Sequence, residues 1–126
     1  MMPRRPNELS PAAGEVRSVS STKEDRKARR VGVSCRLFFF GDEDFEGEAH
    51  LLDLSSTGCM ARSMEPLLVG RKLKLSLFLP DGHDWPVRVE EAVVRWVRDC
   101  TCGLEFLSIR PSHLHRVQQL IMKKKR

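Results

Sequence analysis

The chain contains no tyrosine, and aromatic residues make up only 6% of its 126 residues. Proteins that bind nucleic acid on a sheet surface carry stacking aromatics beside a basic groove, so this composition disfavours that class. Long hydrophobic runs are also missing, because the longest, residues 37–40, falls far below the roughly 20 residues that cross a bilayer. No apolar region follows Arg4 and Arg5, so nothing indicates a secretory signal. These absences predict a cytoplasmic protein without a membrane span.

Metal-binding and catalytic spacings are missing as well. The four cysteines include one CxC pair, Cys100 and Cys102, without a second pair, and the four histidines are scattered along the chain. Zinc sites and catalytic triads require spacings that neither set provides. We therefore expect reduced cysteines in the core or in turns, no metal, no cofactor and no enzymatic activity. Trp85 and Trp96 are expected to fill the core or one end of the fold.

The net charge of +5 is unevenly divided along the chain. Residues 1–36 have nine Lys/Arg and four Asp/Glu, residues 37–110 have eight and thirteen, and residues 111–126 have five and none. The middle of the chain is therefore acidic, and the positive charge lies at the two ends. A protein that binds a polymer along its sheet would carry the basic stripe on the sheet itself. This distribution favours one small anionic ligand over a nucleic acid.

Apolar residues alternate with polar ones through most of the chain, which is typical of half-buried strands. The pattern predicts strands over residues 31–39, 49–54, 59–62, 73–79, 87–97 and 102–107, with a bulge near Glu90 and Glu91 in the fifth. Ser112 is the predicted N-cap of a last helix that packs on the strands through Leu114, Val117 and Ile121. We expect an all-β-dominated fold in which six antiparallel strands close a small barrel followed by one C-terminal helix.

Two short motifs 23 positions apart supply the chemistry of a binding site. Residues 26–30 form an RxxxR stretch with a further arginine, Arg29, and residues 53–58 form a DxSxxG stretch. Guanidinium groups at Arg26 and Arg30 can grip phosphate or the O6 and N7 acceptors of guanine, and a carboxylate can accept from guanine N–H groups. Asp53 provides that carboxylate.

The remaining DxSxxG residues include a serine with a small hydroxyl and a glycine with a wide range of backbone conformations. The Ser55 hydroxyl can meet a phosphate or a backbone group, and Gly58 allows a positive φ or a close approach of a ligand to the main chain. Taken singly, each motif has a simpler interpretation. The basic run can be a solvated segment, and the DxSxxG stretch can be a turn between two strands. Together and in this order, they predict a site for a guanine-bearing phosphodiester.

These residues, with the strand segments at residues 70–80, 93–96 and 103–106, resemble the PilZ domain family, the bacterial receptor module for cyclic diguanylate (cyclic di-GMP). The resemblance covers residue 25 to the C-terminus and implies a split β-barrel. It also implies a ligand held by Arg26, Arg30, Asp53, Ser55 and Gly58, with Arg29 as an additional contact.

The resemblance further implies second-messenger signalling that controls motility, biofilm formation or related surface behaviour through an unidentified protein partner. We expect residues 1–22 to be a flexible N-terminal segment and residues 23–126 to be the domain. Ligand binding is then expected to order the N-terminal segment and change its partner contacts. Two alternatives remain open, a PilZ-fold adaptor that binds proteins but no nucleotide, as in type IV pilus assembly, and a small nucleic-acid-binding barrel.

Overall fold

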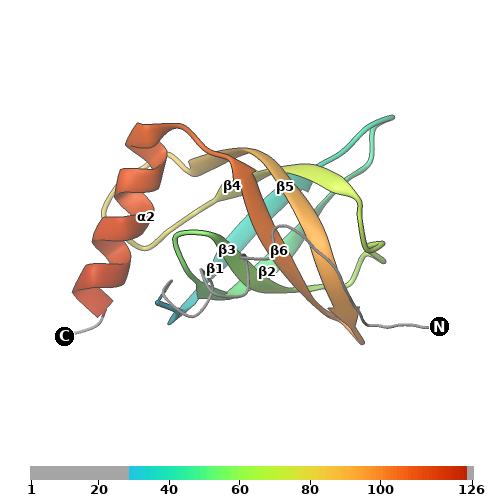
Figure 1. The fold of residues 1–126 in the computed structure, drawn as a ribbon, viewed down its shortest axis with the longest axis horizontal. Helices are drawn as coiled ribbons and strands as arrows, with labels where there is room; N and C mark the ends of the chain where they lie inside the picture. The colour runs from blue at the N-terminus through green and yellow to red at the C-terminus, as the bar shows by residue number, and fades with distance from the viewer. Residues whose placement is uncertain (1–28, 125–126) are drawn as a thin grey trace.

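The computed structural model describes residues 29–124 and places six antiparallel strands and one helix there (Figure 1). The strands are β1 (Val31–Phe40), β2 (Glu46–Leu54), β3 (Gly58–Ser63), β4 (Lys72–Leu77), β5 (Val87–Arg98) and β6 (Thr101–Ser108), and the helix is α2 (Pro111–Lys124). The strands form a closed barrel in the order β1-β2-β3-β6-β5-β4. The predicted six-stranded barrel with a C-terminal helix is therefore confirmed.

The barrel interior is filled by the apolar positions of the alternating strand patterns. Leu37 and Phe39 of β1 are almost fully buried, as are Leu73, Leu75 and Leu77 of β4. The polar residues between them, such as Arg36 and Lys74, are exposed. Burying each large apolar side chain contributes about 1.5–3 kcal/mol, so this alternation fixes which face of each strand points inward. The other face is left for contacts outside the barrel.

Five one-residue shifts interrupt the strand pairing. Two of them lie in β1 between Gly32 and Cys35 and in β6 opposite Glu91 and Ala92, and the other three insert a residue in β5 or β2. Between Val89 and Ala92, β5 advances by one residue more than β4, which confirms the bulge predicted at Glu90 and Glu91. A second bulge in β5 leaves Arg95 without a partner in β6, and a third in β2 leaves Leu52 without a partner in β3. The sequence did not predict these last two. Both lie beside the candidate site, where bulges commonly redirect side chains.

Helix α2 begins two residues earlier than an N-cap at Ser112 requires. Pro111 is its first residue, so the prediction of Ser112 as the N-cap is wrong, and the Arg110 carbonyl accepts from the backbone N–H groups of His113 and Leu114 at 3.0 and 2.9 Å. Proline suits this position because it has no N–H to satisfy and its φ is already helical. The helix packs against the barrel end (Figure 1), and its buried residues are Val117, Leu120 and Ile121.

The cysteines occupy the kinds of position that the sequence predicted. Cys59 and Cys102 are buried in the core, Cys35 is half-buried, Cys100 is exposed in the β5–β6 turn, and all four are free thiols. Burial, followed by the nearby Asp81 charge, raises the pKa of Cys35 to about 11, and burial also raises the pKa of Cys102. These thiols are therefore protonated near neutral pH. Among residues 29–124, no helix is long and apolar enough to cross a membrane.

Candidate ligand-binding site

Arg30 and Asp53 meet where β1 begins. The antiparallel register of β1 and β2 pairs Gly32 with Asp53, so the residue just before β1 lies beside the end of β2. The Arg30 guanidinium donates to the Asp53 carboxylate at 3.1 Å. Their side chains are 47% and 22% exposed, so both remain open to a ligand. Of the other predicted arginines, Arg29 is exposed, and Arg26 lies outside the described residues.

Ser55 lies beneath the surface and shapes the turn between β2 and β3. Its residue is completely buried, and its hydroxyl oxygen accepts from the backbone N–H groups of Thr57 and Gly58 at 3.2 and 3.1 Å. The Ser55 N–H in turn donates to the Gly58 carbonyl at 2.8 Å. The serine hydroxyl therefore meets the backbone groups that the sequence allowed for, and it holds the loop that presents Asp53 and Thr57.

Gly58 is required by a close approach of two strands. A Cβ at this position would lie 2.3 Å from the carbonyl oxygen of Leu104 in β6 and 3.3 Å from the Glu105 Cα. Gly58 does not have a positive φ; among the described glycines only Gly70 and Gly82 do. The structure thus gives Gly58 a reason that the sequence did not predict, the close approach of the β6 backbone, which lies beside β3 under the site.

The bulge at Arg95 turns two consecutive side chains of β5 outward. Val94 pairs with Leu104 and Trp96 with Gly103, and Arg95 lies between them. Arg95 forms an ion pair with Glu105, and the indole of Trp96 covers Gly103, where a Cβ would lie 2.1 Å from the indole nitrogen. Trp96 is 42% exposed and Trp85 is 58% exposed. The expectation that both tryptophans fill the core or a barrel end is therefore wrong.

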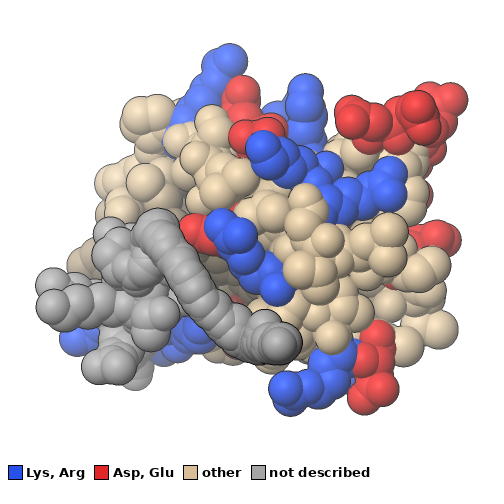
Figure 2. All heavy atoms as spheres, turned by 45° about the vertical axis from the view of Figure 1, so that its right-hand side comes forward, with Lys and Arg blue, Asp and Glu red and all other residues tan. Residues whose placement is uncertain are grey.

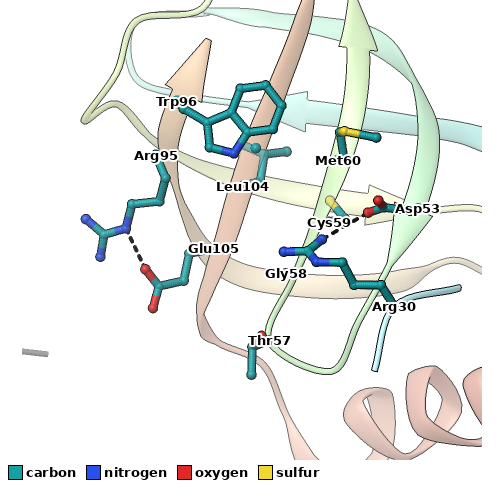
Figure 3. A pocket seen from close by; sticks show the side chains of 11 residues that line it. Arg30, Asp53, Thr57, Gly58, Cys59, Met60, Arg95, Trp96, Leu104 and Glu105 are labelled. Atoms are coloured by element: carbon teal, nitrogen blue, oxygen red, sulfur yellow. Dashed lines mark hydrogen bonds and ion pairs between the residues drawn. The ribbon is translucent and has the colours of Figure 1, made fainter. Parts of the chain in front are cut away.

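These features surround a hollow of about 400 Å³ on the outer face of β2, β3, β6 and β5 (Figure 3). Arg30 and Asp53 lie at one side and Arg95 and Glu105 at the other, and the Trp96 indole lies above Leu104 in this view, between Arg95 and Met60. The volume falls within the roughly 300–1,000 Å³ of small-molecule sites. The lining residues are Arg30, Asp53, Thr57, Gly58, Cys59, Met60, Arg95, Trp96, Gly103, Leu104 and Glu105.

The site has the groups needed to bind a planar, anionic ligand. Two guanidinium groups can contact phosphates or guanine acceptors, two carboxylates can accept from guanine N–H groups, and an exposed indole can stack on a base. Sequence reasoning found Arg30 and Asp53 but missed Arg95, Trp96 and Glu105. The available signal was Gly103, since a glycine opposite an aromatic residue on a paired strand commonly accommodates the ring.

The charges around the site are mixed rather than uniformly basic. Figure 2 shows Lys and Arg side chains interspersed with Asp and Glu over one face, with acidic side chains gathered at its upper right. Within residues 29–124, no group of three or more His, Cys, Asp or Glu side chains is arranged to hold a metal ion. The hollow itself contains two arginine–carboxylate pairs, Arg30 with Asp53 and Arg95 with Glu105.

Comparisons with known proteins agree with this fold. The sequence model of the PilZ domain family matches residues 23–123. Among solved structures, the Bacillus subtilis inhibitor of motility (MotI/DgrA) has a TM-score of 0.68 at 21% identity, covering 79% of this chain and 50% of that one. YcgR from Escherichia coli in complex with c-di-GMP has a TM-score of 0.65 at 16% identity, covering 79% and 46%.

A third similar structure is limited to a single domain. The PilZ domain of CeSA from a cellulose-synthesizing bacterium has a TM-score of 0.60 at 12% identity, covering 78% of this chain and 99% of that one. The chain thus spans about half the length of the B. subtilis and E. coli proteins and nearly the whole of the CeSA domain. A search of curated protein sequences found no match. At these identities, the structural similarity establishes the fold.

Proposed function

This chain belongs to the PilZ domain family, and from that premise we propose that it is a receptor for cyclic diguanylate. The observation behind the proposal is the Arg30–Asp53 pair at the edge of a hollow of about 400 Å³ that also contains Arg95, Glu105 and Trp96. PilZ domains are in general non-catalytic binding domains. The similar E. coli YcgR was solved with c-di-GMP bound, which supports this choice of ligand.

The Arg30–Asp53 pair can be exchanged for ligand contacts at low cost. An ion pair between partly exposed side chains is worth only about 0–1 kcal/mol. A phosphate or a guanine edge can offer Arg30 a bidentate partner, and guanine N–H groups can donate to Asp53. The ligand therefore replaces one weak contact by two directional ones. Trp96 provides a flat surface on which a guanine base can stack.

Arg26 and Arg29 extend the site toward the N-terminal segment. In the proposed complex, Arg26 and Arg30 hold the ligand from one side, Asp53 and the Ser55–Gly58 turn hold it from the other, and Arg29 adds a further cation. The segment that precedes β1 is thereby tied to the barrel, which changes the surface offered to a partner protein. The output is a protein contact in motility, biofilm formation or related surface behaviour.

Calorimetric titration with cyclic diguanylate tests the proposal directly. If each arginine makes a charge-assisted contact worth about 1.5–3 kcal/mol, Arg26→Ala or Arg30→Ala weakens binding about tenfold to a hundredfold. The double variant is expected to show no measurable heat. Arg98→Ala, which removes an exposed arginine outside the hollow, should bind normally and serves as the matched control.

Selectivity and salt dependence separate the proposed receptor from other classes. GTP and cyclic diadenylate should give no comparable heat. Normal affinity in the double arginine variant would overturn the proposal. No heat with the unchanged protein, together with no thermal shift at excess ligand, would move the protein to the class of adaptors that bind only other proteins. Tight, steeply salt-dependent binding to DNA or RNA would instead place it among nucleic-acid-binding barrels.

A further inference from the structure

A second exposed feature lies on a different part of the barrel surface. Phe38 and Phe40 of β1 point outward, and Phe78 follows the end of β4; we call these three residues the aromatic ridge. Phe40 and Phe78 are 41% and 37% exposed, Phe38 is half-buried, and the Phe38 and Phe78 rings pack edge to face at 5.4 Å between centroids. Three adjacent phenylalanines on the outer face of a closed barrel mark an interaction surface.

Charges of opposite sign flank the two sides of this ridge. The strand register places Glu46 of β2 and Lys74 of β4 on either side of Phe40, forming one row across three strands. The next outward row has Glu48 on the β2 side of Phe38 and Ser76 on the β4 side. Glu46, Glu48 and Lys74 are all exposed. Arg36 pairs with Glu48 at 3.9 Å, and its guanidinium lies 5.8 Å from the Phe38 ring centroid, so the charge of Glu48 is offset. The charge contrast is therefore in the Phe40 row, which is acidic on the β2 side and basic on the β4 side.

From this arrangement, we propose that the aromatic ridge is the contact surface of a homodimer, in which it packs against the same ridge of a second copy. The partner follows from the charge pattern. Consider a two-fold axis that is parallel to β1 and lies in the interface plane between the two copies. This axis places the β2 side of one copy, which is acidic, opposite the β4 side of the other, which is basic. Glu46 then faces Lys74 of the second copy, and the reverse pair forms by symmetry.

The alternative two-fold orientation is unfavourable. An axis perpendicular to β1 would place Glu46 opposite Glu46 and Lys74 opposite Lys74, and like charges in direct opposition repel. The favoured axis also agrees with sheet packing, because faces packed in the aligned mode keep their strand directions within about 30° of each other. A closed barrel has no free strand edges, so its copies cannot join by edge-to-edge strand pairing. The surface thus fits itself in one orientation.

The proposed contact is distinct from the ligand-binding site. The hollow lies over β2, β3, β6 and β5, whereas the ridge and its flanking charges lie over β2, β1 and β4. None of Phe38, Phe40, Phe78, Glu46 or Lys74 lines the hollow. The two proposals can therefore fail independently.

Analytical ultracentrifugation over a micromolar-to-millimolar concentration series tests the dimer. The unchanged protein should show a reversible monomer–dimer equilibrium. Phe40→Ser removes an interfacial aromatic side chain and should weaken dimerisation about thirtyfold or more. Trp85 is 58% exposed and lies outside the ridge, so Trp85→Ser removes an exposed aromatic side chain and should leave the equilibrium unchanged. Circular dichroism and thermal unfolding establish that each variant is folded.

Charge reversal tests the orientation of the dimer. Lys74→Glu makes both sides of the ridge acidic, and Glu46→Lys makes its Phe40 row basic on both sides. Each variant alone should dimerise about tenfold more weakly, because two attractive pairs become repulsive. An equimolar mixture of the two should recover a heterodimer. A monomer at millimolar concentration, a dimer indifferent to Phe40→Ser, or a mixture that does not recover would overturn the proposal.

Discussion

Gly58 and Gly103 lie on the outer face of neighbouring strands, but their missing side chains leave room for different neighbours. At Gly58, an added Cβ would meet the backbone oxygen of Leu104, which cannot move without shifting β6. At Gly103, it would meet the ring of Trp96, which is 42% exposed and can turn toward solvent. The absence of a side chain at Gly58 therefore allows β3 and β6 to pair closely, and its absence at Gly103 leaves room for the indole of Trp96.

This difference predicts that alanine at Gly58 mainly lowers stability, whereas alanine at Gly103 mainly lowers ligand affinity. Gly58→Ala should destabilise the barrel by about 1–3 kcal/mol because the strand pair is overpacked. Gly103→Ala should change stability by less but displace Trp96 and, if the indole stacks on a base, weaken cyclic diguanylate binding about fivefold to a hundredfold. Urea unfolding measures the first effect and calorimetric titration the second.

Trp96→Ala is the companion for this comparison because it removes the indole without crowding Gly103. It should lower affinity by about as much as Gly103→Ala. If Gly103→Ala leaves affinity unchanged while unfolding as readily as Gly58→Ala, the indole has no role in binding.

At the scale of elements, the sequence predicted which segments form strands, but it did not predict the positions of most bulges. Alternation of Leu73, Leu75 and Leu77 with polar residues determines a strand and its buried face. The bulges at Leu52 and Arg95 depend on how two separate strands pair, which no local pattern contains. For the same reason, Arg30 and Asp53 could be found by motif, whereas Arg95, Trp96 and Glu105 belong to no motif and had only the indirect signal of Gly103. Their meeting depends on the offset between β5 and β6.

Helix α2 is fastened to the barrel by a buried ion pair. Arg116 donates from Nε and Nη2 to the two Asp81 carboxylate oxygens at 2.9 and 3.0 Å, and the side chains are only 11% and 8% exposed. Burial tends to raise the pKa of Asp81, but the Arg116 hydrogen bonds and the N–H of His83 outweigh it and hold the pKa below its usual 3.8. Asp81 therefore remains ionised beneath the helix.

Removing the arginine from this pair should be costly. Arg116→Met leaves a buried, unpaired carboxylate and should destabilise the protein by about 3–5 kcal/mol. Arg110→Met is the matched control, since Arg110 pairs with Glu90 at 3.1 Å but is 72% exposed, and it should cost at most about 1 kcal/mol. Urea unfolding at neutral pH measures both. Similar losses for the two variants would contradict the role assigned to Asp81.

The same pair predicts a loss of stability in acid. Because the folded pKa of Asp81 is lowered, its contribution is fully present above the usual 3.8 and is lost as the pH falls from there through the folded value. The free energy of unfolding should thus fall below pH 4 in the unchanged protein. In Arg116→Met, this component should be absent or reversed.

At the scale of the whole molecule, the proposed ligand site and the aromatic ridge share one closed barrel but not one movable element. Every strand is paired on both sides, so no strand edge is free to shift between two arrangements. A ligand changes an equilibrium elsewhere only if it binds two states with different affinity. The described residues provide no such pair of states, and the two surfaces are expected to work independently.

Independence has a measurable consequence for the dimer. Saturating cyclic diguanylate should change the dimerisation constant by less than about threefold, which is below the 5- to 150-fold of typical allosteric coupling. By reciprocity, ligand affinity should be the same in monomeric Phe40→Ser and in the dimer. Sedimentation with and without ligand, and titration of both proteins, measure the two sides of this relation. A larger effect would contradict this independence. Repeating the sedimentation with the double Arg26→Ala, Arg30→Ala variant, which should not bind, would then show whether the effect depends on the proposed site, because a ligand response that survived in this variant would have to come from binding elsewhere.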